Sequence, residues 1–139
     1  MERLIEKAKS VCYDLAAVLS VAILLLFMLL GSRAEAAHRH PEKHYQQQWC
    51  DAAGGVTEFV LQDRTRVDCL LDEYAIEFDF ANKWAEAIGQ ALYYGQMTDS
   101  RPGVVLILES TDDRRYLERL HVVADQYGIR VWTVGQGAE

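Results

Sequence analysis

The chain has 139 residues, half of them hydrophobic, a size that fits one domain with an appendage and excludes a two-domain enzyme. It carries 21 acidic and 14 basic residues, so its formal net charge is −7. This charge argues against a protein that coats nucleic acid or anionic membrane without specificity, and it leaves contact through a defined site open.

Residues 1–36 predict an export segment. Residues 15–30 are apolar except for Ser20, and basic residues precede them. Their length lies between the roughly 7–15 residues of a signal-peptide hydrophobic region and the roughly 20 residues of a membrane-spanning helix. An Ala-Glu-Ala tripeptide ending at Ala36 favours cleavage there. The alternative is an uncleaved membrane anchor, and both interpretations export residues 37–139 to the periplasm or the outside.

Two cysteines, Cys50 and Cys69, follow the expected cleavage site. Disulfides persist outside the cytoplasm, so a bridge between them is one prediction. It would close a loop of about twenty residues and contribute about 3 kcal/mol to stability. Two buried free thiols are the alternative that the sequence leaves open.

Residues 37–139 predict a single α/β domain. Tyr45 and Trp49 follow Pro41 at helical spacing, which predicts a first helix within residues 38–51. The further elements are predicted, in chain order, as strands over 56–61, 66–71 and 74–80, a helix over 82–96, a strand over 103–108, a helix over 112–127 with its cap at Thr111 and its end at Gly128, and a strand over 129–134. This order indicates a mixed central sheet that helices cover.

An acidic β-hairpin is the most informative segment. Alternation along the third predicted strand places Glu77 and Asp79 on one face. A two-residue turn at Asp72-Glu73 would set Asp68 directly opposite Glu77. Like charges in such a pair destabilise a sheet, and there is no lysine or arginine between residues 67 and 82 to neutralise them.

A divalent cation or a protonated carboxyl group would relieve this repulsion. Hard cations such as Mg²⁺ take carboxylate oxygens, often together with substrate phosphates and water. The alternative is a hairpin in a different register, with Asp68 and Glu77 both in water.

The following helix brings polar side chains toward the same place. Lys83, Gln90 and Tyr94 lie in one row along it. Lys83 follows the acidic strand closely enough to reach back to Glu77 and Asp79, although on its own it reads as a surface lysine. Metal-binding carboxylates, a cation and polar hydrogen-bonding groups are the parts of a phosphoryl-transfer site.

These residues resemble the PD-(D/E)xK nuclease superfamily, which has the restriction-endonuclease-like fold. The resemblance covers most of residues 37–139, whose predicted α-β-β-β-α-β core order is similar, with a further α-β. It implies that Asp68 and Glu77 bind Mg²⁺ or Mn²⁺, with Asp79 as a further catalytic acid that can hold the metal, and that Lys83 positions the attacking water. The triplet Glu77-Phe78-Asp79 departs from the family pattern, because an acid stands where the lysine is expected and Lys83 looks like a migrated lysine.

The resemblance extends to the helix and to function. Gln90 and Tyr94 fit the Q-x3-Y motif of the RecB-like branch, which implies substrate contact. The expected function is an exported Mg²⁺-dependent hydrolase that cleaves phosphodiester bonds of nucleic acid. The alternative is a non-catalytic exported module that binds a partner, binds metal or serves a structural role on the same scaffold.

Other candidates are weaker. His38, His40 and His44 follow the expected cleavage site and predict an exposed tether more than a metal site. His121 is expected to pack in the core. The arginines of the last predicted helix are typical of a solvated face.

Overall fold

The structure of the chain is a computed structural model that describes residues 1, 3, 18–23 and 38–138. The chain divides into two units, Met1–Ala37 and His38–Glu139. Residues 18–23 are helical, and the rest of the apolar stretch and the expected cleavage site lie outside the described residues. Within the described ranges, no helix has the length and apolar content needed to cross a membrane.

The second unit follows the predicted order of elements, with ends within about two residues of expectation except at the start of the first helix, which begins at Glu42 within the predicted range 38–51. The helices and strands are α2 (Glu42–Ala53), β1 (Val56–Val60), β2 (Arg66–Leu70), β3 (Tyr74–Phe80), α3 (Trp84–Thr98), β4 (Arg101–Ile107), α4 (Arg114–Tyr127) and β5 (Arg130–Val134). Short 3-10 turns, η1 (Ala81–Lys83) and η2 (Thr111–Asp113), lead into α3 and α4, and a third, η3 (Gln136–Ala138), follows β5.

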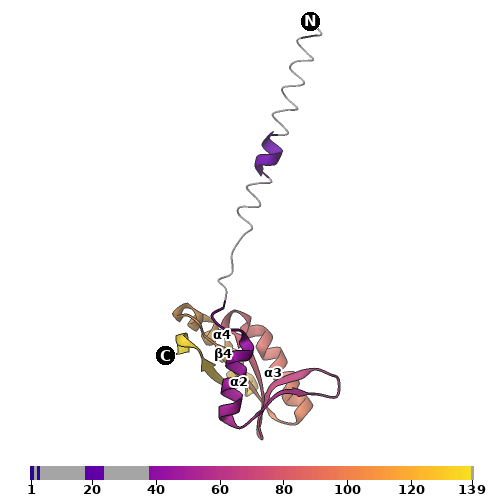
Figure 1. The fold of residues 1–139 in the computed structure, drawn as a ribbon, viewed down its shortest axis with the longest axis vertical. Helices are drawn as coiled ribbons and strands as arrows, with labels where there is room; N and C mark the ends of the chain where they lie inside the picture. Colours follow the sequence, from indigo (N-terminus) through magenta and orange to yellow (C-terminus); the bar gives the residue numbers. More distant parts are fainter. Residues whose placement is uncertain (2, 4–17, 24–37, 139) are drawn as a thin grey trace. The chain divides into compact units, whose positions relative to one another are not determined.

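The strands form one mixed sheet in the order β1-β2-β3-β4-β5 (Figure 1). The pairs β1–β2 and β2–β3 are antiparallel, and β3–β4 and β4–β5 are parallel. Cys69 pairs with Ile76, which confirms the register predicted from a two-residue turn at Asp72-Glu73. Because α3 connects the parallel strands β3 and β4, it begins just beyond the carboxyl end of β3.

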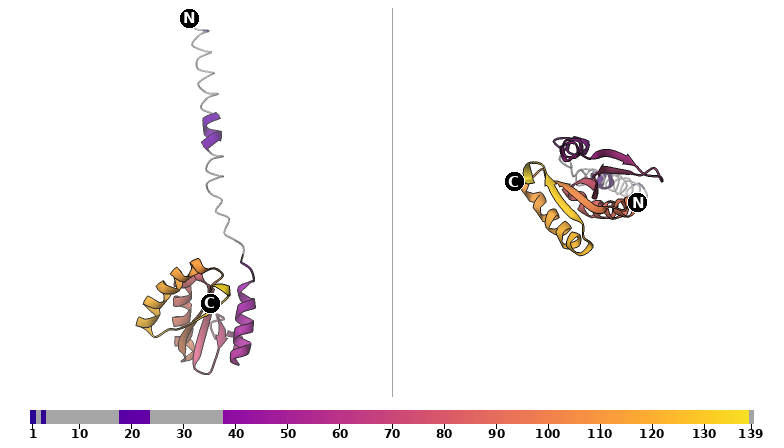
Figure 2. Two further views of the ribbon diagram at one scale, coloured as in Figure 1. Left: turned by 90° about the vertical axis from the view of Figure 1, so that its left-hand side faces the viewer. Right: turned by 90° about the horizontal axis from the view of Figure 1, so that it is seen from below.

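Helices cover both faces of the sheet, with α2 on one side and α3 and α4 on the other (Figure 2). The core under α3 and α4 includes Ala87, Ala91, Val104, Leu106, Leu108, Leu120 and Ala124. The core under α2 includes Cys50, Cys69, Ile76, Phe78 and Val105. Since Phe78 packs under α2, Glu77 and Asp79 face the α3 side, as the alternation predicts.

Two details of α4 differ from the sequence prediction. A capping box between Ser110 and Asp113 starts the 3-10 turn before the helix, one residue earlier than the predicted cap. His121 is exposed instead of packed in the core, because Leu120 and Ala124 occupy the buried stripe of the helix.

The histidine segment is exposed from His38 to His40, as predicted, but His38 contacts the rest of the domain. The His38 ring stacks on Phe80 at 3.4 Å between ring centroids, and its Nδ1 atom lies 2.8 Å from Glu109 Oε2. His40 and His44 stack on each other at 4.4 Å between ring centroids. This segment therefore closes one end of the sheet through aromatic contact.

Candidate active site

One surface cavity of about 380 Å³ brings together six side chains that the sequence singled out. They come from β2, β3, η1 and α3. They are Asp68, Glu77, Asp79, Lys83, Gln90 and Tyr94. The residues predicted to bind metal, to act in catalysis and to contact substrate therefore share one site.

Asp68 lies where β2 and β3 diverge. The ladder between these strands reaches Cys69, paired with Ile76. One residue further, Asp68 Oδ2 accepts a hydrogen bond of 2.8 Å from the backbone N–H of Phe78. The carboxylate thus satisfies a β3 amide beyond the ladder. It also accepts a hydrogen bond from the carboxyl group of Glu77, the residue predicted to lie opposite it.

Glu77 and Asp79 are buried acids, only 6% and 3% exposed. Asp79 Oδ1 accepts a hydrogen bond of 3.0 Å from the backbone N–H of Phe80. Glu77 Oε2 is buried and has no hydrogen-bond partner among the described residues. Because an unpartnered buried oxygen is costly, and more so when charged, this site favours either a proton or a cation on Glu77.

The pKa values of these three carboxyl groups rise in the folded protein. Burial raises the pKa of Asp68 to about 6, against the opposing hydrogen bond from Phe78. Burial also raises the pKa of Asp79 to about 6, against the opposing charge of Lys83. Burial, followed by the negative charges of Asp68 and Asp79, raises the pKa of Glu77 to about 10. Without a cation, the cavity therefore keeps Glu77 protonated at neutral pH.

Lys83 supplies a positive charge from the last position of η1. Its Nζ atom lies 3.5 Å from Asp79 Oδ1, and its side chain is about half exposed. The negative charge of Asp79 raises the pKa of Lys83, so the ammonium group stays charged at neutral pH. Lys83 can therefore orient water or offset negative charge, and it is not a general base.

Gln90 and Tyr94 lie one turn apart on α3. The Tyr94 hydroxyl group donates a hydrogen bond of 3.4 Å to Gln90 Oε1. Burial, with the charges of Glu77 and Asp68, raises the pKa of Tyr94 to about 12. The phenol therefore remains protonated, and its hydroxyl group can exchange the Gln90 partner for a ligand in the cavity.

The cavity also contains residues that the sequence analysis missed. Glu42, from the first turn of α2, hydrogen-bonds with Asp79, and Glu86 projects from α3. The spacing from Glu86 to Gln90, one helical turn, was a signal that could have found Glu86. No local pattern connects Glu42 to β3, because only the packing of α2 brings them together. The lining also includes Arg64 and Thr65 from the turn before β2, Arg66 at the start of β2, and Phe78.

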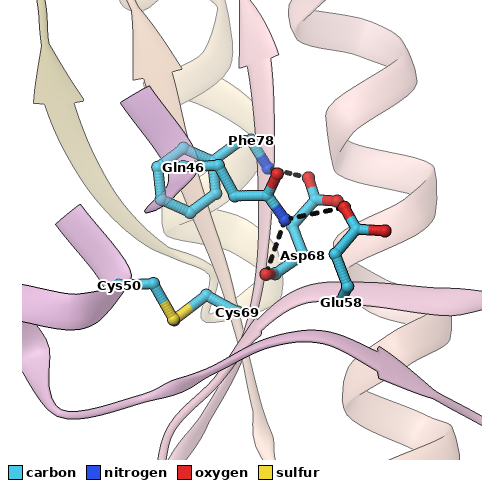
Figure 3. The surroundings of a disulfide bond; sticks show 6 residues. All are labelled: Gln46, Cys50, Glu58, Asp68, Cys69 and Phe78. Atoms are coloured by element: carbon cyan, nitrogen blue, oxygen red, sulfur yellow. Dashed lines mark hydrogen bonds between the residues drawn. A yellow bond between two sulfur atoms is a disulfide. The ribbon is translucent and has the colours of Figure 1, made fainter. Parts of the chain in front are cut away.

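α2 holds Asp68 in place through two contacts (Figure 3). The structure joins Cys50 of α2 to Cys69 of β2 in a disulfide, with the Cα atoms 5.8 Å apart. One turn away, the buried Gln46 side chain donates hydrogen bonds of 2.7 Å to the Asp68 carbonyl oxygen and 3.1 Å to Glu58 Oε1. Both contacts reach the backbone at or beside Asp68, so α2 positions this carboxylate.

The donor set of the cavity fits a hard divalent cation such as Mg²⁺ or Mn²⁺. Such cations take carboxylate oxygens, which Asp68, Glu77, Asp79 and Glu42 offer. The Oε2 atom of Glu77, which has no hydrogen-bond partner among the described residues, is available as a metal ligand. No group of three or more His, Cys, Asp or Glu side chains in the described part of the chain is arranged to hold a metal ion. Binding would therefore require side-chain rotations within the cavity.

Comparisons of the chain with models of protein families, with curated proteins and with solved structures found no match.

Proposed function

We propose that this chain is an exported, divalent-metal-dependent phosphodiesterase that hydrolyses nucleic acid on a PD-(D/E)xK, restriction-endonuclease-like scaffold. One observation carries the proposal: three carboxyl groups with raised pKa values, the buried Glu77 and Asp79 and the half-buried Asp68, share a cavity with a charged lysine. Groups with perturbed pKa values in a cleft are typical of functional sites. An ion-pair network that only stabilised the fold would not leave Glu77 Oε2 buried and unpartnered.

The order of elements supports the scaffold assignment. The α-β-β-β-α-β order from α2 to β4 is the order that the superfamily resemblance implies. Asp68 on β2 and Glu77 on β3 occupy the positions of the metal-binding acids in that resemblance. Both side chains line the same cavity.

Each residue has a role that its environment supports. Asp68, Glu77 and Asp79 would hold the cation, and Glu42 belongs to the same cluster of carboxylates. A bound Mg²⁺ or Mn²⁺ would supply an activated water and offset the charge of the scissile phosphate. Lys83 orients that water or the phosphate through its charged ammonium group. Gln90 and Tyr94 donate hydrogen bonds to the substrate backbone.

Export is part of the proposal. The disulfide between Cys50 and Cys69 supports an oxidising compartment for residues 37–139. N-terminal sequencing of the exported protein tests the cleavage after Ala36. A product that begins at residue 37 supports a cleaved signal peptide, whereas an intact Met1 on a membrane-bound product supports the anchor.

Calorimetric titration with Mn²⁺ and Mg²⁺ tests the metal site. Wild type should bind the cation. Asp68→Asn and Glu77→Gln should each weaken binding by at least about tenfold, because each substitution keeps the shape of the side chain and removes the charge of one ligand. Asp125→Asn is the matched control, since Asp125 is exposed on α4 and does not line the cavity. No binding by wild type would remove the proposed function.

Plasmid nicking in Mg²⁺ tests the chemistry. Lys83→Ala should lower the cleavage rate by about 10²-fold or more while the metal affinity changes little, because Lys83 acts on charge that develops during the reaction. Metal binding without cleavage by wild type would favour the non-catalytic module. In that case the absence of cleavage would be explained by Asp79, which stands where the superfamily pattern has its catalytic lysine.

A further inference from the structure

The tip of the β1–β2 hairpin presents an arginine to the cavity. The tip turns between Leu61 and Thr65, where the Leu61 N–H donates to the Thr65 carbonyl oxygen at 2.9 Å and the Arg64 N–H donates to the Leu61 carbonyl oxygen at 3.0 Å. Arg64 lines the cavity together with Thr65. The hairpin extends beside α3 (Figure 1), and α3 also contributes residues to the cavity lining.

The tip is braced against α3 through one carboxylate. Asp63 accepts hydrogen bonds from the Thr65 backbone N–H at 3.0 Å and from Thr65 Oγ1 at 2.7 Å. The hydroxyl group of Tyr93, on α3, also donates to Asp63. Tyr93 is the neighbour of Tyr94, which lines the cavity. These contacts hold the residue after Asp63 at the edge of the acidic site.

Arg64 differs from the other cations that line the cavity, because its guanidinium group has no partner in the described part of the chain. Arg66 is paired with Glu58 at 3.0 Å, and Lys83 is paired with Asp79 at 3.5 Å. Among the described residues, the Arg64 side chain makes no hydrogen bond, ion pair or ring contact. An exposed, unpaired guanidinium group beside an acidic cavity is available to an anionic ligand.

The backbone of Arg64 is strained. Its φ angle is 73°, in the left-handed region that favours glycine or asparagine. A side chain held in this region costs free energy that a glycine would not cost. Strained positions of this kind gather at ligand-binding sites, where the surrounding structure holds them.

We propose that Arg64 binds a backbone phosphate of a nucleic-acid strand whose neighbouring phosphodiester occupies the carboxylate cavity, an inference that rests on the proposed function. The planar guanidinium fork matches phosphate oxygens. Arg66 and Lys83 are already engaged by carboxylates, so, of the described cations that line the cavity, Arg64 is free to take a second phosphate. A polyanion with successive phosphates fits this arrangement better than a single phosphate group does.

We call the contact between Arg64 and a backbone phosphate the clamp. Fluorescence anisotropy tests it with labelled single-stranded DNA and RNA oligonucleotides. The measurement is made in Ca²⁺, and gels check that the strand stays intact. Arg64→Ala and Arg64→Gly should both weaken oligonucleotide binding about three- to tenfold and lower the salt-dependence slope by about 0.7. Arg64→Lys should retain most of the affinity. Arg119→Ala, which removes the same charge from α4 outside the cavity lining, should change neither quantity.

Two further measurements separate the clamp from folding and from the metal site. Arg64→Gly should melt at the wild-type temperature or a few degrees above it, because glycine relieves the left-handed strain, and both Arg64 variants should keep the wild-type Mn²⁺ affinity. Unchanged oligonucleotide affinity and salt slope, with Mn²⁺ still bound, would overturn the clamp alone. Equal competition by inorganic phosphate at the same phosphate concentration would also overturn it, in favour of a single-phosphate site. If wild type does not bind Mn²⁺, the proposed function itself is overturned.

Discussion

Binding of a divalent cation to the cavity should expel protons, and their number reports which carboxyl groups bind. At pH 7 a carboxyl group with a pKa near 6 is about one-tenth protonated, whereas one with a pKa near 10 is fully protonated. Asp68 and Asp79 have pKa values of about 6, and Glu77 has one of about 10. Ligation by all three should therefore release about 1.2 protons per cation at pH 7, nearly all from Glu77.

The pH dependence of this release separates Glu77 from the pair Asp68 and Asp79. At pH 5 Asp68 and Asp79 are each about nine-tenths protonated, so the release should rise to about 2.8 protons per cation. Glu77→Gln should lower the value at pH 7 to about 0.2, because the amide has no proton to lose. Calorimetric titration of Mn²⁺ in two buffers that differ in ionisation enthalpy measures these numbers.

A specific result would refute this reasoning. If wild type binds Mn²⁺ at pH 7 but releases fewer than about 0.3 protons, Glu77 either keeps its proton or is already ionised. The burial and repulsion assigned to it would then not act as described. Asp125→Asn, an exposed change on α4, should match wild type and serves as the control.

Four predictions concern stability. Reduction of the Cys50–Cys69 disulfide should lower the free energy of unfolding by about 3 kcal/mol, because the bridge restricts the unfolded chain; equal urea midpoints with and without dithiothreitol would contradict this. Gly55→Ala should destabilise the fold by about 1–3 kcal/mol in thermal denaturation, since its Cβ would lie 2.6 Å from Cys69 Sγ. Gly89→Ala, in mid-α3 with nothing within 4 Å of the added Cβ, should instead stabilise the fold by about 1 kcal/mol. The last prediction compares wild type with Asp68→Asn in urea titrations with EDTA present. The free energy of unfolding of wild type, relative to that of the variant, should fall by about 1–3 kcal/mol from pH 4 to pH 7, because the pKa of Asp68 is raised in the folded state. A difference between the two proteins that does not change with pH would contradict this prediction.

The helices and strands, and much of the site, follow from local sequence patterns. The turn at Asp72-Glu73 sets the register of the β2–β3 hairpin, so Asp68 and Glu77 can be placed from sequence alone. Lys83 is the last residue of η1, which directly follows β3. The distance between Lys83 and Asp79 therefore depends on only a few residues of chain. Strand alternation and helical spacing are short-range properties, which is why these positions are predictable.

Other parts of the site depend on contacts between distant segments. Glu42 and Gln46 reach the cavity region only because α2 packs on the sheet, and the helical pattern of α2 says nothing about which strand it covers. The disulfide between Cys50 and Cys69 was one of two alternatives until the fold brought these residues together. Arg64 belongs to a turn whose tilt toward α3 is set by Asp63 and Tyr93.

The sequence by itself determined the order of elements, the hairpin register and the shared face of Glu77 and Asp79. It left open whether that face lies in water or in the protein. The tertiary structure decided this point, because α2, α3 and the β1–β2 hairpin close around β3 and exclude water from its carboxyl groups. Burial of charge is a property of packing, and it turns an acidic hairpin into a site that favours protons or a cation.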